Sequence, residues 1–268
     1  MKRVVLALLL LLPGAPALLA QPVEERVEIW VPGPESRQVV LGARLLRPAG
    51  PGPFPAVVLL HDCLGVTEHE LQWAERLRGW GHVALLLDRF SVPGADTICR
   101  GESATASLWQ AVHAEAAQAW LVATRRDVRP DRIAVLGWGQ GGSAVLFLVH
   151  NFYELRDRPF SAAIALHPTC RQPNPLRNLD APLLILVGSE DLFPRSMAPA
   201  AHCEQMAAER EGSRDKPLEL VVYPGAHSGF DREGIDATVG DRRFLYQPEA
   251  AEDAIARIRA FLARSLNG

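Results

Sequence analysis

The sequence has no run of like charges, no internal repeat and no low-complexity tract among its 268 residues. Its formal net charge is −3, and its basic residues form no stripe of the kind that binds nucleic acid. No linker divides the chain, and no apolar segment beyond the first twenty residues is long enough to cross a membrane. We therefore expect residues 21–268 to form one globular domain with a sizeable core and no nucleic-acid partner.

The first twenty residues have the pattern of a secretory signal peptide. Two basic residues precede an apolar run over residues 4–12, and small residues around Ala17 and Ala20 fit two cleavage positions. An uncleaved membrane anchor is the alternative, although the run is short for a membrane span. We expect residues 1–20 to be removed and the mature protein to be periplasmic or secreted, without membrane contact.

Cysteine is scarce, and its spacing shows no C-x-x-C pair of the kind that binds zinc or carries redox chemistry. In an exported protein an even number of cysteines indicates disulfides, and four cysteines allow three pairings, which the spacing leaves open. The four are Cys63, Cys99, Cys170 and Cys203. A metal cluster with nearby histidines is the alternative, but the spacing matches no zinc pattern. We expect disulfides, and neither a metal nor a cofactor.

Apolar runs with the length of strands alternate with helical patterns along the chain. Residues 27–29 and 38–46 roughly alternate apolar and polar side chains, which predicts an antiparallel pair with one solvated face. Later runs are continuously apolar, as is typical of strands buried on both faces of a parallel sheet. These runs are 56–60, 83–87, 133–136, 162–166, 183–187 and 218–222.

Helical patterns separate these runs, at residues 68–80, 104–124, 143–155, 197–210 and 249–266. In the second helix we expect Leu108, Val112 and Leu121 to face the core. Strands that alternate with helices form right-handed βαβ units. The sequence therefore predicts an α/β protein with a mostly parallel, doubly wound sheet flanked by helices.

A sharp turn rich in glycine stands where a catalytic nucleophile would be expected. An apolar strand leads into Gly137-Trp138-Gly139-Gln140-Gly141, and a helical run follows. Strand, glycine-flanked turn and helix are the context of the G-x-S-x-G nucleophile elbow. Position 139 should then carry Ser or Cys, but it carries glycine, which has no side chain to attack a carbonyl.

Other parts of an acyl-transfer site follow in the chain order that this elbow predicts. Asp191 comes after an apolar strand and is the expected acid, with Glu190 as the less favoured choice. His227 follows a Pro-Gly turn after the next strand and is the expected base. The backbone amides of Cys63 and Gln140 are the expected oxyanion donors. A solvated loop aspartate and a surface histidine are the alternatives for the acid and the base.

Side chains that could contact a substrate come from the same loops. We expect Asp62, Arg89, Trp138 and Phe230 to contribute to a substrate site. Arg89 and Arg100 are candidates to hold a substrate carboxylate, with a surface role as the alternative for each. Core packing is the alternative for the two aromatic residues.

These segments together resemble the dienelactone hydrolase family, and its exported branch in particular, over nearly all of the chain after residue 20. The resemblance is carried by His61-Asp62-Cys63-Leu64-Gly65-Val66, Asp88-Arg89-Phe90 with Pro93-Gly94 and Cys99 beyond, Gly137-Trp138-x-Gln140-Gly141-Gly142, Gly188-x-Glu190-Asp191 and Pro224-x-Ala226-His227-x-x-Phe230. It implies an α/β-hydrolase fold, with a triad of Ser or Cys, Asp and His acting on small-molecule esters or lactones.

The resemblance also implies the disulfides Cys63–Cys99 and Cys170–Cys203. Two positions depart from the family pattern. Gly139 replaces the Ser or Cys nucleophile, and Asp62 stands where cytoplasmic members carry Glu, so that a charge there is expected near the nucleophile position.

Gly139 allows three interpretations of the function. Covalent catalysis is lost, or a water activated by His227 and Asp191 replaces the nucleophile, or a displaced Ser143 or Ser228 serves. We favour a dienelactone-hydrolase-like protein with impaired or atypical catalysis. The alternative is a non-catalytic periplasmic protein that binds small molecules in the old substrate pocket.

The rest of the site is expected to be intact, so Gly139→Ser is expected to raise esterase activity well above wild type. Hydrolysis of p-nitrophenyl acetate that depends on His227 would indicate an esterase. Thermal stabilisation by a ligand without turnover would indicate a binding protein.

Overall fold

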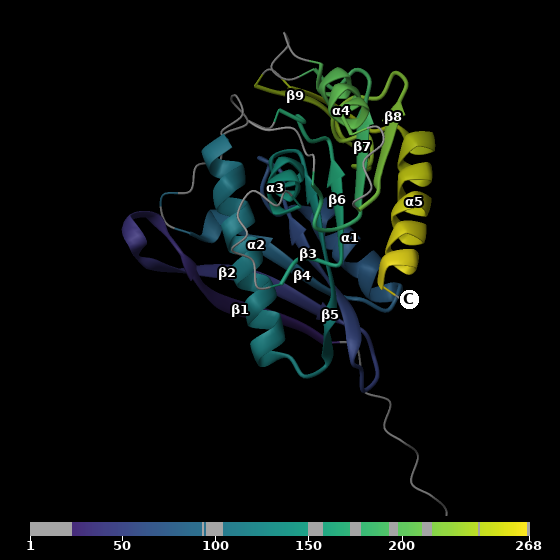
Figure 1. Cartoon of the computed structure of the whole chain (residues 1–268). Coiled ribbons are helices and arrows are strands. Elements are labelled where there is room, and N and C mark those ends of the chain that lie inside the picture. The colour runs from purple at the N-terminus through teal and green to yellow at the C-terminus, as the bar shows by residue number, and fades with distance from the viewer. Residues whose placement is uncertain are drawn as a thin grey trace, which may run out of the picture.

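A computed structural model describes residues 23–92, 94, 104–149, 158–171, 178–192, 198–210, 216–240 and 242–266. A mostly parallel sheet of eight strands is flanked by helices on both faces, and a two-stranded hairpin lies outside it (Figure 1). The strands are β1 (Val23–Pro32), β2 (Gln38–Arg47), β3 (Phe54–Leu60), β4 (Val83–Asp88), β5 (Val128–Trp138), β6 (Ala162–Leu166), β7 (Leu183–Gly188), β8 (Leu218–Tyr223), β9 (Asp236–Val239) and β10 (Arg242–Leu245).

The order of the strands in the sheet is β1-β2-β4-β3-β5-β6-β7-β8. β2 pairs antiparallel with both β1 and β4, whereas every pair from β4 to β8 is parallel. The six parallel strands therefore end at the same edge of the sheet, which is where sites gather in folds of this kind. The sequence-based prediction of an α/β fold with a mostly parallel sheet is confirmed.

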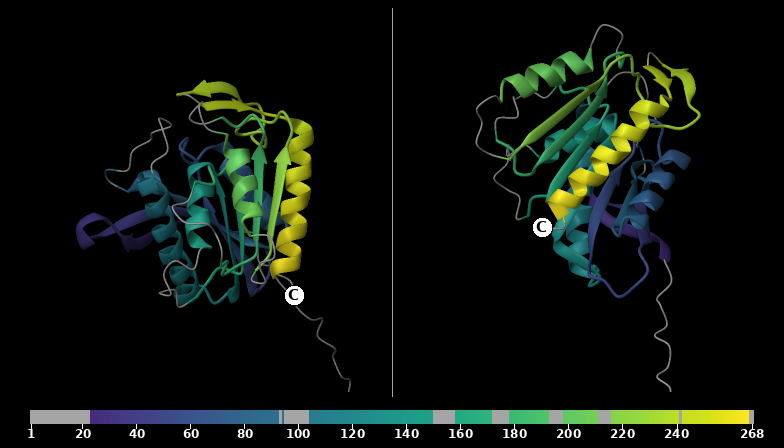
Figure 2. Two further views of the ribbon diagram at one scale, coloured as in Figure 1. Left: turned by 45° about the horizontal axis from the view of Figure 1, so that its top comes forward. Right: turned by 90° about the vertical axis from the view of Figure 1, so that its right-hand side faces the viewer.

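The α-helices are α1 (Glu68–Gly79), α2 (Ala104–Thr124), α3 (Gln140–Leu148), α4 (Pro199–Ala208) and α5 (Pro248–Leu266), and short 3-10 turns lie at Pro34–Ser36 and Arg89–Ser91. Buried side chains of α2, α3 and α4 pack on one face of the sheet, and those of α1 and α5 pack on the other. Figure 2 shows α5 lying along its face of the sheet. Consecutive apolar residues of the central strands, such as Leu59 and Leu60, belong to opposite layers, which explains their continuously apolar sequence. Among the described residues no helix has the length and apolar character that crossing a membrane requires.

Two sequence-based expectations differ from the structure. Leu108 was expected in the core but is 43% exposed, because α2 turns its alanines and Leu121 toward the sheet. The β9–β10 hairpin was not predicted, since strands of four residues are too short for a periodic signal. The hairpin crosses above the carboxyl ends of the neighbouring strands (Figures 1 and 2), and it carries a buried arginine to that edge.

The disulfide Cys170–Cys203, which the family resemblance implied, joins the loop after β6 to α4. Cys63 is also disulfide-bonded. Cys99, its expected partner, lies outside the described residues, as does Arg100. The confirmed bond closes a sequence separation of 33 residues on one face of the sheet.

Replacing both Cys170 and Cys203 by Ser is expected to lower the free energy of unfolding by about 3–4 kcal/mol, the value that the loop-entropy model gives for a loop of this length. Urea unfolding followed by circular dichroism measures the change. The double variant is preferred to single ones because it leaves no unpaired thiol. An unchanged unfolding midpoint would contradict a stabilising role for this bond.

Candidate functional site at the carboxyl edge of the sheet

The loops at the carboxyl edge bring together the segments that the sequence singled out. Asp62 lies in the loop after β3, and Gly139 lies between β5 and α3. Asp191 follows β7, and His227 follows β8. Because these four strands are parallel, their loops meet at one edge.

Gly139 has the backbone of a sharp strand-to-helix turn. Its φ of 50° and ψ of −109° lie in a region that residues with a side chain adopt only with strain, about 1–3 kcal/mol. A Cβ at Gly137 would overlap the carbonyl of Gly141, and a Cβ at Gly141 would overlap the carbonyl of Leu60. The flanking glycines are therefore needed for close backbone approach, and the elbow keeps its form without its nucleophile.

The Asp62 side chain fills the space that a nucleophile would use. A Cβ placed on Gly139 would overlap the Asp62 carboxyl group, with its Oδ2 only 2.6 Å away. The Oδ1 atom of Asp62 accepts hydrogen bonds from the backbone N–H of Cys63 at 2.6 Å and of Gln140 at 3.3 Å. These are the two amides that the sequence predicted as oxyanion donors. They converge on one point, and a carboxylate oxygen of the chain itself occupies it.

Asp191 does not bind His227 in this structure. Its carboxylate accepts hydrogen bonds from Ser228 and from Arg242 of β10, the latter at 3.3 Å, and His167 lies 3.6 Å away. Burial opposes its ionisation, but the charge of Arg242 and the contacts with His167 and Ser228 outweigh burial and hold the pKa of Asp191 at about 2. The predicted acid is thus buried and ionised, but its contacts are with Ser228, Arg242 and His167 and not with His227.

The His227 ring is partly exposed and faces the backbone instead. Its Nδ1 lies 3.0 Å from the carbonyl oxygen of Glu190, so Nδ1 carries the proton and Nε2 is left as the basic nitrogen. The backbone N–H of His227 donates to Gln247. Its ring is therefore oriented as a base, by a carbonyl rather than by a carboxylate.

The two serines considered as displaced nucleophiles are both buried. Ser228 is wholly buried between Asp191 and Arg242. Ser143 lies in α3 beside Thr169. The contacts of the two hydroxyls that the structure describes are with Asp191 and Arg242 for Ser228, and with Thr169 for Ser143.

A buried chain of charges extends from the site toward α1. His167 lies between Asp191 and Asp231, with Nε2 3.1 Å from the Asp231 carboxylate. Burial lowers the pKa of His167, but the two carboxylates outweigh burial and raise it. Burial likewise opposes ionisation of Asp231, but the neighbouring His69 and His167 hold its pKa well below the usual range. No group of three His, Cys, Asp or Glu side chains that could hold a metal ion occurs in the described part of the chain.

Trp138 and Phe230, predicted to line the site, are packed in the core. Trp138 is 1% exposed and donates its indole N–H to Asp231 at 2.9 Å. Phe230 is fully buried against the rings of His167 and Tyr223. For both residues the packing alternative is the one that the structure shows.

Arg89 lies at the edge of the site, where its backbone N–H donates to Nε2 of His61 and its guanidinium lies over the Phe90 ring. Arg242 and Asp231 were missed from the sequence. An arginine in a short hairpin has the same local sequence pattern as a surface arginine, so nothing marked Arg242 as buried. Of this buried group, His167 gave a signal, because it directly follows an apolar strand.

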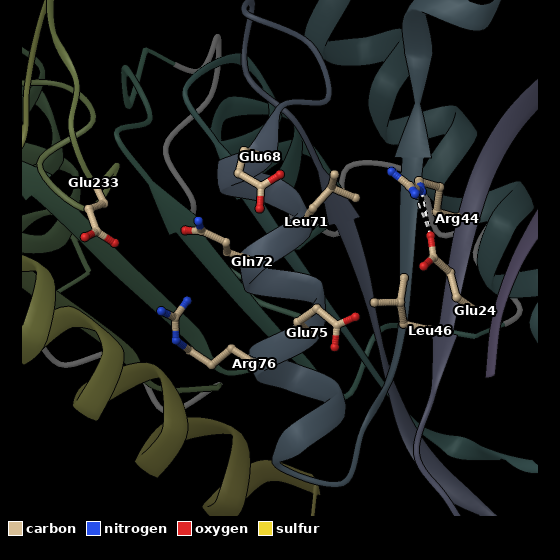
Figure 3. A pocket seen from close by; sticks show the side chains of 9 residues that line it. All are labelled: Glu24, Arg44, Leu46, Glu68, Leu71, Gln72, Glu75, Arg76 and Glu233. Carbon is tan, nitrogen blue, oxygen red and sulfur yellow. Dashed lines mark hydrogen bonds and ion pairs between the residues drawn. The ribbon is translucent and has the colours of Figure 1, made fainter. Parts of the chain in front are cut away.

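A separate groove lies away from this edge, between α1 and the β1–β2 pair, with a volume of about 710 Å³ (Figure 3). Its floor includes Leu46 and Leu71, and glutamates and arginines surround them. Glu24 of β1 and Arg44 of β2 form an ion pair on the strand side of the groove, as the dashed lines show. None of the predicted site residues lines this groove.

Comparisons with known proteins agree with the fold. The model of the dienelactone hydrolase family matches residues 41–266. A solved structure described as a dienelactone hydrolase from Klebsiella pneumoniae has 21% sequence identity and a TM-score of 0.67, covering 90% of this chain and 99% of that one. An esterase from Pyrococcus furiosus has 17% identity and a TM-score of 0.63, covering 91% and 94%. A dienelactone hydrolase-like promiscuous phosphotriesterase from metagenomic libraries has 14% identity and a TM-score of 0.65, covering 91% and 98%. No curated protein matched.

Arg242→Met is expected to lower the free energy of unfolding at pH 7 by about 3–5 kcal/mol, because it leaves buried carboxylates without their counter-charge. In the wild type, the depressed pKa of Asp191 gives stability above pH ~4 that is lost as the pH falls through about 2. In the variant, burial raises the pKa of Asp191, so the difference from wild type should shrink on acidification.

Urea unfolding between pH 7 and pH 4 measures this difference. Arg243→Met is the matched control, since the neighbouring Arg243 is partly exposed and, among the described residues, pairs with Asp236 at the surface. Equal stability of the two variants would contradict a structural role for the buried arginine.

Proposed function

Because this chain belongs to the dienelactone hydrolase family, we propose that it is an exported hydrolase-fold protein in which the acyl-enzyme route of ester and lactone hydrolysis is blocked. The observation that carries the proposal is the position of the Asp62 carboxylate. It takes the space of the missing nucleophile side chain and also the place of the oxyanion.

The missing nucleophile and the filled oxyanion hole both impair the acyl-enzyme route. Removing the nucleophile of a triad costs about 10⁶ in kcat, on the order of 8 kcal/mol of barrier. Loss of a single oxyanion donor costs about 10²–10³. Here a carboxylate oxygen fills the hole, so a substrate carbonyl would have to displace it.

The position of the Asp62 carboxylate also hinders hydrolysis by an activated water. His227 has a basic Nε2 and a fixed ring, as such a route requires. The attacked carbonyl oxygen would still need the amides of Cys63 and Gln140, which Asp62 holds. Water attack on an ester therefore lacks its main electrostatic stabilisation as well.

The geometry also removes the basis for expecting a gain from Gly139→Ser alone. A side chain at position 139 overlaps Asp62, and the hole stays filled unless Asp62 moves. The other parts of the site are therefore not ready for a restored nucleophile. Asp62 must be shortened at the same time.

We expect wild type and Gly139→Ser to hydrolyse p-nitrophenyl acetate no faster than their His227→Ala counterparts. The double variant Asp62→Gly with Gly139→Ser is expected to exceed both by about tenfold or more, because it frees the hole and supplies a hydroxyl. Release of p-nitrophenol is the measurement, and Asp62→Gly alone is the control. Wild-type hydrolysis that His227→Ala abolishes would overturn the proposal.

Export is a second part of the proposal. The signal-like residues 1–20 support it, and so does the Cys170–Cys203 disulfide, since such bonds persist in oxidising compartments. Expression of the full chain in a secreting bacterium should give a periplasmic protein that begins after Ala17 or Ala20. N-terminal sequencing of the fractionated protein measures this, and an intact Met1 in the cytoplasmic fraction would contradict it.

A further inference from the structure

The two oxygens of the Asp62 carboxylate have different surroundings. Oδ1 accepts from the amides of Cys63 and Gln140, and the Nη1 atom of Arg242 lies 3.6 Å away. Oδ2 accepts no hydrogen bond from any described residue, and it is not one of the enclosed polar atoms that lack a partner. The small exposed part of this side chain, 4%, therefore includes the unbound oxygen.

The carboxyl group is thus held through one oxygen while the other accepts no hydrogen bond from a described residue. Asp and Glu carboxylates can act as nucleophiles that form covalent intermediates. Gly139 makes the arrangement possible, because any side chain at that position would overlap the carboxyl group.

The occupied hole decides which electrophile such a nucleophile could attack. An ester substrate would place its own carbonyl oxygen in the hole, which Asp62 Oδ1 already fills. Attack on a saturated carbon generates no oxyanion on the substrate. The charge develops later, on the carbonyl of Asp62 itself, whose oxygen is already bound by two amides.

We propose that Asp62 is a catalytic nucleophile for small alkyl halides, with Oδ2 as the attacking atom. In the first step Oδ2 forms a bond to the saturated carbon while the carbon–halogen bond breaks, and the halide leaves with the electron pair. The product is an alkyl ester of Asp62. A halide leaves without protonation, so this step needs no general acid.

In the second step a water attacks Cγ of the Asp62 ester, and we assign its proton to Nε2 of His227, which comes from the loop after β8 at the same edge of the sheet. Oδ1 carries the negative charge of the tetrahedral intermediate, between the amides of Cys63 and Gln140. Collapse of the intermediate expels the alcohol, which takes the proton from His227. Overall, an alkyl halide and water give an alcohol, a halide ion and a proton.

The test uses 1-bromobutane with the purified mature protein. We expect bromide release from wild type, loss of release to the buffer level in Asp62→Asn, and accumulation of a butyl ester on Asp62 in His227→Gln. Bromide is measured colorimetrically and the ester by mass spectrometry of the peptide that contains Asp62. Asp236→Asn, at an exposed position of the hairpin, is the control and should release bromide as wild type does.

A single turnover in H₂¹⁸O gives the decisive readout. Attack of water on the Asp62 ester leaves ¹⁸O in the Asp62 carboxylate and unlabelled oxygen in the alcohol. Label in the alcohol alone, or a folded wild type that neither releases bromide nor forms the ester, would overturn the proposal. The p-nitrophenyl acetate assay is independent of the bromide assay. A protein that releases no bromide would leave the proposed loss of ester hydrolysis standing, and a protein that hydrolyses the ester would not by itself decide whether Asp62 attacks an alkyl halide.

Discussion

The Asp62 carboxylate and the missing side chain at Gly139 depend on each other. The carboxyl group lies where a Cβ at position 139 would be, and its Oδ1 is held by the two amides that the elbow and the β3 loop present. A nucleophile at position 139 would displace the carboxylate, and displacement would leave those amides open. One small volume therefore holds either a side chain at position 139 or the Asp62 carboxyl group, but not both.

The surrounding charges keep this arrangement in place. Arg242 reaches the site from the short β9–β10 hairpin and is 4% exposed, close to both Asp62 and Asp191. This buried arginine lies 3.6 Å from Asp62 and 3.3 Å from Asp191, so the hairpin and the loops of β3 and β7 are coupled through it. Asp191, held in this way, is not available to orient His227, and the carbonyl of Glu190 does so instead.

The scaffold could be predicted from the sequence because its signals are local and repeated. Continuous apolar runs predicted the parallel strands, and a glycine-flanked turn after a strand predicted the elbow. Side-chain partnerships within the site could not be predicted in this way. Chain order placed Asp191 and His227 at one edge, but Asp191 bonds to Arg242 and not to His227, and the hairpin of Arg242 is too short to leave a periodic pattern. The motif after β3 predicted a charge near the nucleophile position, but not that the Asp62 carboxyl would occupy the space of the missing side chain at Gly139 and accept from both amides.

An oxyanion hole is a fixed pair of donors, and it stabilises whichever carbonyl oxygen it holds. With a serine at the elbow that oxygen belongs to the substrate, and the reaction is acyl transfer. With Asp62 in the hole the oxygen belongs to the protein, so the amides can assist only steps in which charge develops on Asp62. Loss of one side chain at Gly139 thus changes which molecule supplies the carbonyl, while the strand order, the elbow and the two amides stay the same.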